Sequence, residues 1–168
     1  MQEWLTGVIG QLPFGLKIIA IFIISMVPII ELRGALLVAP AVDLSPFISM
    51  PLAIISNLIP VPFIILFIKK IFAWMRKVSP KLNKIVDKME AKAEKNKEKV
   101  LKYAFWGLVL FVAIPLPGTG AWTGSLVAAM LDMPLKKAFP PILVGVIIAG
   151  IIMTFISYGA ASIFMKIF

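Results

Sequence analysis

Three long stretches without a charged residue constrain this sequence more than any other feature. They cover residues 47–68, 103–131 and 138–165 and are 22, 29 and 28 residues long. A helix needs roughly 20 apolar residues to cross a bilayer, so each stretch is long enough. The chain is 61% hydrophobic, whereas an ordinary globular domain is about half apolar. We therefore expect an all-α integral membrane protein whose apolar surface faces lipid.

Charged residues interrupt an earlier apolar region of the chain. The uncharged segments 18–30 and 34–42 are 13 and nine residues long. Glu31 and Arg33 lie between them. At about 1.5 Å per residue, such helices cover roughly 14 to 20 Å, which reaches only the middle of a hydrocarbon core about 30 Å thick. The pattern predicts a re-entrant helical hairpin over 16–43, which enters and leaves the membrane by the same face.

A second hairpin is predicted over 103–132, where the segment PLPGTG at 115–120 breaks the apolar stretch. Backbone that is not helical at membrane depth is tolerated only where protein or a watery cavity surrounds it, so both hairpin tips are expected to be buried. The aligned residues of the two halves are 32–36 with 122–126 and, with one gap, Asp43 with Asp132 and Pro51 with Pro140. Each half then crosses the membrane once, so the halves are predicted to form an inverted repeat.

The predicted order is that of a single membrane domain over residues 1–168. Its parts are an interfacial helix over 1–15, a first half over 16–75 with its hairpin at 16–43 and a spanning helix at 46–75, a connector helix over 76–102, and a second half over 103–168 with its hairpin at 103–132 and a spanning helix at 136–166. The N-terminal segment has no basic residues ahead of an apolar core, so it does not resemble a cleaved secretory signal.

The net charge of +9 is concentrated in one segment, since 12 of the 17 Lys and Arg residues lie within 69–102. The positive-inside rule places this segment in the cytoplasm, which predicts a loop rather than a nucleic-acid-binding surface. Lys136 and Lys137 then fall on the same side, and both chain termini fall on the outer side. The connector is predicted to be a basic amphipathic helix that Ser79 caps and Pro80 opens. It rests on lipid headgroups, pairs with another copy or captures anionic lipid.

The sequence contains no cysteine and no histidine. Disulfides, thiol nucleophiles, haem, iron–sulfur clusters and the usual zinc sites are therefore excluded. An aspartyl intramembrane protease needs two apposed aspartates, but Asp43 and Asp132 are predicted on opposite faces of the bilayer. A serine enzyme lacks its histidine, which leaves only a Ser-Lys variant. We expect no catalytic residue, no cofactor and no metal.

Glu31 and Arg33 at the first tip are the most informative pair of residues. Ionisable groups deep in a membrane cost at least about 3 kcal/mol each and persist mostly where they are paired or functional. Burial disfavours the charged form of Glu31, which suits it to carry a proton, whereas Arg33 stays charged and can meet an anion. The alternative is an internal salt bridge that locks the tip.

The second tip leaves backbone N–H groups free at the start of the next helical segment, where the helix dipole favours an anion. If both tips meet near the midplane, as broken helices do in secondary transporters, they form one substrate site. The candidate donors in that site are Arg33, Thr119 and Thr123. Alternatively the glycines, with Gly120 and Gly124 in a GxxxG spacing, only permit close helix contact.

Three further polar residues are candidates with simpler explanations. Asp43 and Asp132 close the two hairpins, and each either relays protons with Glu31 or caps an interfacial turn. Asn57 lies in the first predicted spanning helix, and it either bonds a neighbouring helix or lines the substrate site.

Two motifs carry a family resemblance, VPIIELRGALLVA around the first tip and FVAIPLPGTGAWTGSLVA around the second. In these motifs the chain resembles the small multidrug export protein family, over most of its length. Through its paired re-entrant hairpins that family looks like a distant branch of the DedA superfamily of membrane transporters. Some DedA proteins are implicated in moving lipid phosphates across bacterial membranes and in proton-motive-force dependence. DedA proteins carry additional acidic and arginine residues near their tips, whereas the second tip of this chain has no arginine.

The resemblance implies a small, proton-coupled secondary transporter in a prokaryotic cytoplasmic membrane. It also carries over the motif residues of the family as candidate site residues, which are Glu31, Arg33 and Gly34 in the first tip and Pro115, Pro117, Gly118, Thr119, Gly120, Trp122, Thr123 and Gly124 in the second. Its expected partners are membrane lipids, protons and a small amphipathic or anionic substrate, either a lipid phosphate or a drug-like compound. A homodimer is an arrangement that so small a unit allows. A noncatalytic membrane or assembly factor and an oligomeric channel are the alternatives.

Overall fold

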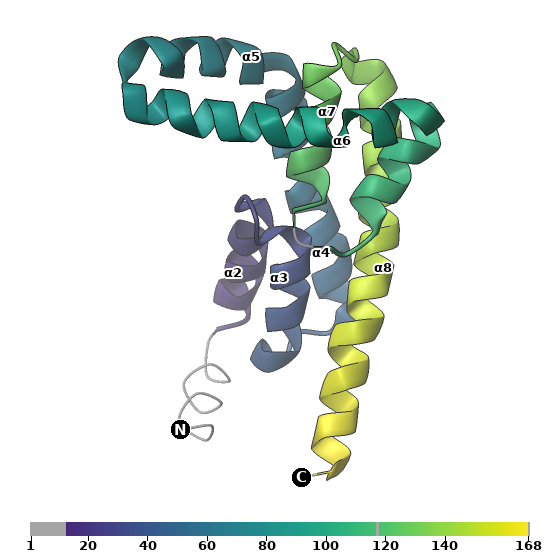
Figure 1. Cartoon of the computed structure of the whole chain (residues 1–168). Helices are drawn as coiled ribbons and strands as arrows, with labels where there is room; N and C mark the ends of the chain where they lie inside the picture. The colour runs from purple at the N-terminus through teal and green to yellow at the C-terminus, as the bar shows by residue number, and fades with distance from the viewer. Residues whose placement is uncertain (1–12, 117, 168) are drawn as a thin grey trace. The chain divides into compact units, whose positions relative to one another are not determined.

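Helices are the only regular elements in the computed structural model, which describes residues 13–116 and 118–167 (Figure 1). In chain order they are α2 (Phe14–Met26), α3 (Glu31–Val38), the 3₁₀ helix η1 (Ala39–Val42), α4 (Pro46–Leu58), α5 (Pro60–Val78), α6 (Pro80–Ala113), α7 (Ala121–Met130) and α8 (Leu135–Ile167). The all-α fold expected from the sequence is confirmed for this part of the chain. The interfacial helix predicted over 1–15 lies almost wholly outside the described residues.

Among the described residues, two helical segments are long and apolar enough to cross a membrane. They are Pro46–Val78, which comprises α4 and α5, and Leu135–Ala160 within α8. Only 33% and 39% of their most apolar windows are buried inside the molecule, and large side chains such as Phe155 are exposed on them. Exposed apolar surface of this extent suits a lipid environment. The two segments correspond to the spanning helices predicted from the sequence.

Prolines mark the beginnings of several helices. Pro46, Pro60 and Pro80 are the first residues of α4, α5 and α6, a position where the missing N–H has no helical partner to lose. The predicted cap of α6 is confirmed, because the Ser79 hydroxyl accepts a hydrogen bond from the Lys81 N–H at 3.3 Å. From this cap α6 continues to Ala113, so the predicted connector and the first arm of the second hairpin lie on one element.

The chain divides into two compact units, and α8 contributes to both. The first unit comprises Met1–Leu58 with Val146–Phe168, and in it the hairpin of α2 and α3 packs against α4. Ser25 of α2 donates from Oγ to the carbonyl oxygen of Ala53 in α4 at 2.7 Å. The hydroxyl of Tyr158 in α8 donates to the Leu44 carbonyl, and it forms a second hydrogen bond with the hydroxyl of Ser49 in α4. Polar contacts therefore join the helices of this unit.

The second unit, Ile59–Gly145, is built around α7, which packs against α5 and α6. Two glycines of this unit lie against Val112 of α6. A Cβ atom added at Gly124 or Gly145 would lie 2.6 or 2.7 Å from the Val112 side chain. Larger residues would force these helices apart, so the structure supports the close-contact explanation for Gly124.

The same backbone corner is present in both units. Asp43 after η1 and Asp132 after α7 both adopt the left-handed conformation, with φ of 52° and 54°. At each corner the Asp N–H donates to the carbonyl three residues back and the next N–H donates to the carbonyl five residues back, at 3.0–3.2 Å. These two bonds are those of a Schellman motif, which satisfies the last carbonyls of a helix. Backbone geometry therefore explains an Asp at both corners, because Asp tolerates this conformation better than most residues.

Matching features continue on both sides of these corners, which lie 89 residues apart. The helices α4 and α8 each begin three residues after the aspartate and carry a proline, Pro51 or Pro140, at their sixth residue. Near the tips, the Gly34 N–H donates to the Ile30 carbonyl at 3.0 Å, and the Gly124 N–H donates to the Gly120 carbonyl at 2.8 Å. The segments that align in sequence thus share the same order of local features. Their inverted orientation in the membrane remains a prediction.

Candidate functional site

The first hairpin tip is a short turn over 27–30, between α2 and α3, with an unusual backbone. Ile29 has a φ of 79° and Glu31 a φ of 52°, and a positive φ is rare for a β-branched residue. Such conformations cost about 1–3 kcal/mol each and persist only where the surrounding structure holds them. Here the Glu31 N–H donates to the Val27 carbonyl at 3.0 Å. The turn leaves Ile29 96% exposed and directs Glu31 inward, where it is only 3% exposed.

Glu31 is the one ionisable side chain that is buried among the residues with described burial. Arg33 follows on the same helix and is half-buried. The two side chains interact electrostatically, so the structure brings together the pair that the sequence singled out. Burial destabilises the ionised form of a carboxyl group, and the attraction of a nearby cation offsets part of this cost. Protonation of Glu31 would therefore change the field at Arg33.

Asn57 lies at the level of the first tip, on the buried face of α4. The bond between Ser25 and Ala53 fixes the last turn of α2 beside the middle of α4. Asn57 follows Ala53 by one helical turn on the same face, and Figure 1 shows the α2–α3 turn beside the second half of α4. Asn57 is fully buried, and neither of its amide atoms has a hydrogen-bond partner among the described residues. Each such group costs about 1–3 kcal/mol, so a polar ligand would be stabilised here.

The second tip is held by its own side chains. The Thr119 hydroxyl donates to the carbonyl oxygens of Ile114 and Leu116 at 2.8 and 2.9 Å. Gly118 and Gly120 have φ values of 85° and 123°, which a residue with a Cβ atom adopts only with strain. Three of the predicted substrate-binding residues therefore have an evident role in shaping this turn.

The remaining predicted residues lie close to the two tips. Trp122 and Thr123 are half-buried in the first turn of α7, and Pro115 is half-buried just after α6. Gly34 lies in the first turn of α3, where an added Cβ would lie 2.2 Å from the Ile30 side chain. Pro117 lies outside the described residues. The two tips belong to different units, so their convergence on one site remains a prediction.

The motifs at both tips agree with a comparison against protein families. A family model described as "Putative small multi-drug export protein" matches residues 31–152. The chain belongs to this small multidrug export protein family. No curated protein and no solved structure matches the chain. Membership of an export family implies a transporter rather than an enzyme, and the two apolar spanning segments make this export protein a membrane protein.

In this export protein, Asp43 and Asp132 are exposed at the corners rather than buried at the tips. Asp43 and Glu31 lie at opposite ends of the segment formed by α3 and η1, which at 1.5 Å per residue separates them by roughly 18 Å. Asp132 forms an ion pair with Lys69 of α5 at 2.5 Å. The structure therefore does not bring Asp43 to the first tip, and it gives Asp132 a partner that the sequence did not indicate.

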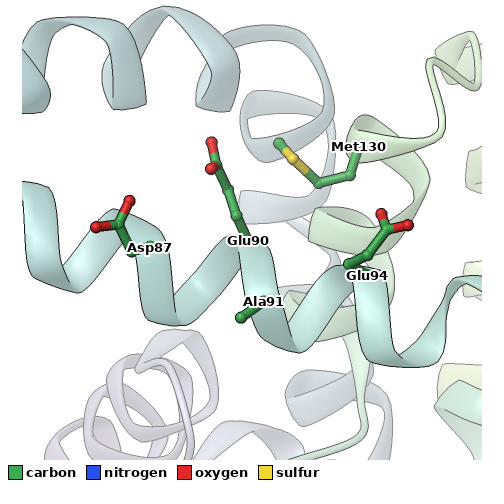
Figure 2. A pocket seen from close by; sticks show the side chains of 5 residues that line it. All are labelled: Asp87, Glu90, Ala91, Glu94 and Met130. Atoms are coloured by element: carbon green, nitrogen blue, oxygen red, sulfur yellow. The ribbon is translucent and has the colours of Figure 1, made fainter.

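A charged cavity of about 410 Å³ lies on α6 in the second unit. It is lined by Asp87, Glu90, Ala91, Glu94 and Met130 (Figure 2). Arg76 of α5 pairs with the carboxylates of Asp87 and Glu90 at 2.8 and 2.7 Å. Among the described residues, no group of three or more His, Cys, Asp or Glu side chains could hold a metal ion. The two ion pairs of Arg76 join α5 to α6 beside this cavity, and we call them the Arg76 clamp.

Sequence reasoning missed this clamp, although one signal for it was available. Asp87, Glu90 and Glu94 are spaced three and four residues apart, which places their carboxylates on one face of a helix. Figure 2 shows them on the same side of α6. The signal was masked by the many lysines in the same segment, which favoured a reading of the helix as basic throughout.

Proposed function

We propose that this protein is a proton-coupled secondary transporter in which Glu31 carries the proton and Arg33 contacts an anionic amphipathic substrate. The observation that carries the proposal is the burial of Glu31 in a strained turn. Family membership supports transport, and ionisable groups at membrane depth mark ion and substrate pathways. The resemblance to the DedA superfamily points to lipid phosphates as substrates. Asn57, buried at the same level without a partner among the described residues, is proposed to contact the polar part of the substrate.

The charges at the first tip determine how proton and substrate are coupled. With Glu31 ionised, its negative charge lies beside Arg33 and opposes the approach of an anion. With Glu31 protonated, the positive charge of Arg33 remains, because an arginine stays protonated under cellular conditions. An anionic substrate therefore binds together with a proton, and the two move in the same direction. A lipophilic cation would instead compete with the proton for Glu31 and show the opposite pH dependence.

We further propose that the two hairpins are re-entrant and belong to inverted halves, with the connector segment 76–102 on the cytoplasmic side. The matching corners at Asp43 and Asp132 support a repeat, and the basic residues of the connector support its side. In this arrangement Asp43 and Asp132 end the hairpins at opposite membrane faces. Proton coupling is assigned to Glu31 rather than to these two aspartates, because both are exposed and both have a backbone role.

The proposal is tested by transport into proteoliposomes that hold purified protein and an imposed pH gradient. Glu31→Gln is expected to make flux of a lipid phosphate independent of the gradient, because the amide cannot exchange a proton. Arg33→Ala is expected to weaken substrate binding roughly tenfold to a hundredfold, the loss of one hydrogen bond to a charged group. Glu94→Gln makes the same chemical change on α6 and should leave the flux unchanged.

The same assay separates the alternatives. A flux of lipophilic cationic dye that rises as the pH rises would replace the anionic substrate with a cationic one. Ion currents without a substrate would favour a channel. If the Glu31→Gln protein folds and still transports in response to the gradient, Glu31 is not the coupling residue.

A further inference from the structure

An apolar groove lies in the second unit, between the start of α5 and the start of α8. It is an open groove with a volume of about 470 Å³, and it is lined by Pro62, Leu135, Lys136, Phe139 and Pro140. Four of these five residues are apolar. Lys136 is the only charged side chain in this lining, and it is exposed. The groove is therefore amphipathic, with a cation beside an apolar surface.

The ion pair between Lys69 and Asp132 marks the depth of this groove in the membrane. The first long uncharged stretch of the chain ends at Lys69, and charged groups of a spanning protein lie at the interface with water. Pro62 precedes Lys69 by seven residues on α5, which at 1.5 Å per residue places it roughly 10 Å further into the apolar region. α5 leaves the apolar region as it approaches Lys69, whereas α8 enters it after the corner at Asp132. Lys136 is therefore nearer the interface than Pro140, which lies one turn further along α8. The groove thus extends from the level of lipid headgroups toward the level of acyl chains.

The positive charge of Lys136, at the mouth of the groove, is not balanced by an ion pair among the described residues. Lys136 and Lys137 lie in the first turn of α8, which contains no acidic residue, although the positive end of a helix favours anions. The nearby carboxylate of Asp132 is paired with Lys69 at 2.5 Å. Among the described residues, neither Lys136 nor Lys137 forms an ion pair. An anionic group at this position would interact with Lys136 and with the helix dipole, and only at longer range with Lys137.

We propose that the groove binds an anionic phospholipid, with the phosphate at Lys136 and an acyl chain along Pro62, Phe139 and Pro140. Basic pockets between membrane helices recognise anionic headgroups in this way. Free phosphate would gain no binding energy from the apolar walls. A zwitterionic lipid would be attracted less strongly to Lys136 than an anionic one. None of the residues that line the groove belongs to either tip, so the proposal does not depend on the proposed transport function.

Native mass spectrometry of the purified full-length protein tests the proposal, with phosphatidylglycerol and phosphatidylcholine of equal chain length as probes. The wild-type protein is expected to retain phosphatidylglycerol preferentially. Lys136→Ala should weaken this retention about fivefold, as expected for the loss of one lysine contact with an anionic lipid. Lys137→Ala is the matched control, because Lys137 carries the same charge but does not line the groove. Its effect should be clearly smaller.

Two variants test the apolar part of the site with both lysines intact. Pro62→Trp and Leu135→Trp fill the groove from opposite walls, and each should abolish the preference for phosphatidylglycerol in protein that elutes as the wild type does. Glycerol phosphate, which has the charge but no acyl chain, should not displace the bound lipid. Equal losses in Lys136→Ala and Lys137→Ala, equal retention of both lipids, or displacement by glycerol phosphate would each overturn the proposal.

Discussion

At the scale of single residues, the first tip concentrates features that work against stability. Glu31 is buried although it is ionisable, Ile29 has a positive φ although it is β-branched, and Asn57 is buried without a partner among the described residues. Each feature costs free energy in a folded protein. Their occurrence at one level of the first unit is typical of a functional site, where such costs are retained because a ligand or a proton uses the groups concerned.

Asn57→Leu provides a test at this scale. The substitution removes two buried polar groups and keeps a side chain of similar size, so thermal stability in detergent should rise, by about 1–3 kcal/mol for each unsatisfied group removed. Transport should fall at the same time. Ser56→Ala is the neighbouring control, since the Ser56 hydroxyl donates to the Leu52 carbonyl within its own helix. A less stable Asn57→Leu protein with normal transport would show that Asn57 bonds another part of the protein.

At the scale of elements, the corners at Asp43 and Asp132 explain how the hairpins end. Both aspartates take the left-handed position of a Schellman motif, for which glycine is the usual residue. The corner therefore does not require an acidic side chain. It does require a residue that tolerates a positive φ.

Asp43→Gly and Asp132→Gly are expected to retain both folding and transport. Asp43→Val and Asp132→Val should each lose about 1–2 kcal/mol of stability, because a β-branched residue resists a positive φ. Thermal melting in detergent and flux in proteoliposomes give the two readouts. If the glycine variants fold normally but lose the response to a pH gradient, the aspartates relay protons after all.

The sequence predicted those elements whose signals are local. Uncharged length indicated the spanning helices, and Ser79 with Pro80 indicated the beginning of α6. It could not indicate the end of the connector, because a charged helix and an apolar helix have the same backbone and join without a break. The pairing of Lys69 with Asp132, the burial of Asn57 and the groove beside Lys136 depend on packing between segments far apart in the sequence, which no local pattern encodes.

At the scale of the whole molecule, the chain consists of two units that each contain one hairpin, one Asp corner and part of the spanning helices. The proposed inverted topology has a direct test, since the sequence contains no cysteine. Single cysteines at Ser45 and Ser162 are expected to react with an impermeant reagent from outside the cell, and one at Ser79 only after the membrane is opened. Labelling of Ser45 from the cytoplasmic side would exclude inverted halves.

The central claim, that Glu31 exchanges a proton when an anionic substrate binds, is tested most directly by measuring proton uptake. Substrate is added to purified protein in weakly buffered detergent solution with a pH indicator, and the wild type is compared with Glu31→Gln. We predict that the wild type takes up protons from solution on binding a lipid phosphate and that the Glu31→Gln protein binds it without proton uptake. Equal proton uptake by the two proteins would contradict the account.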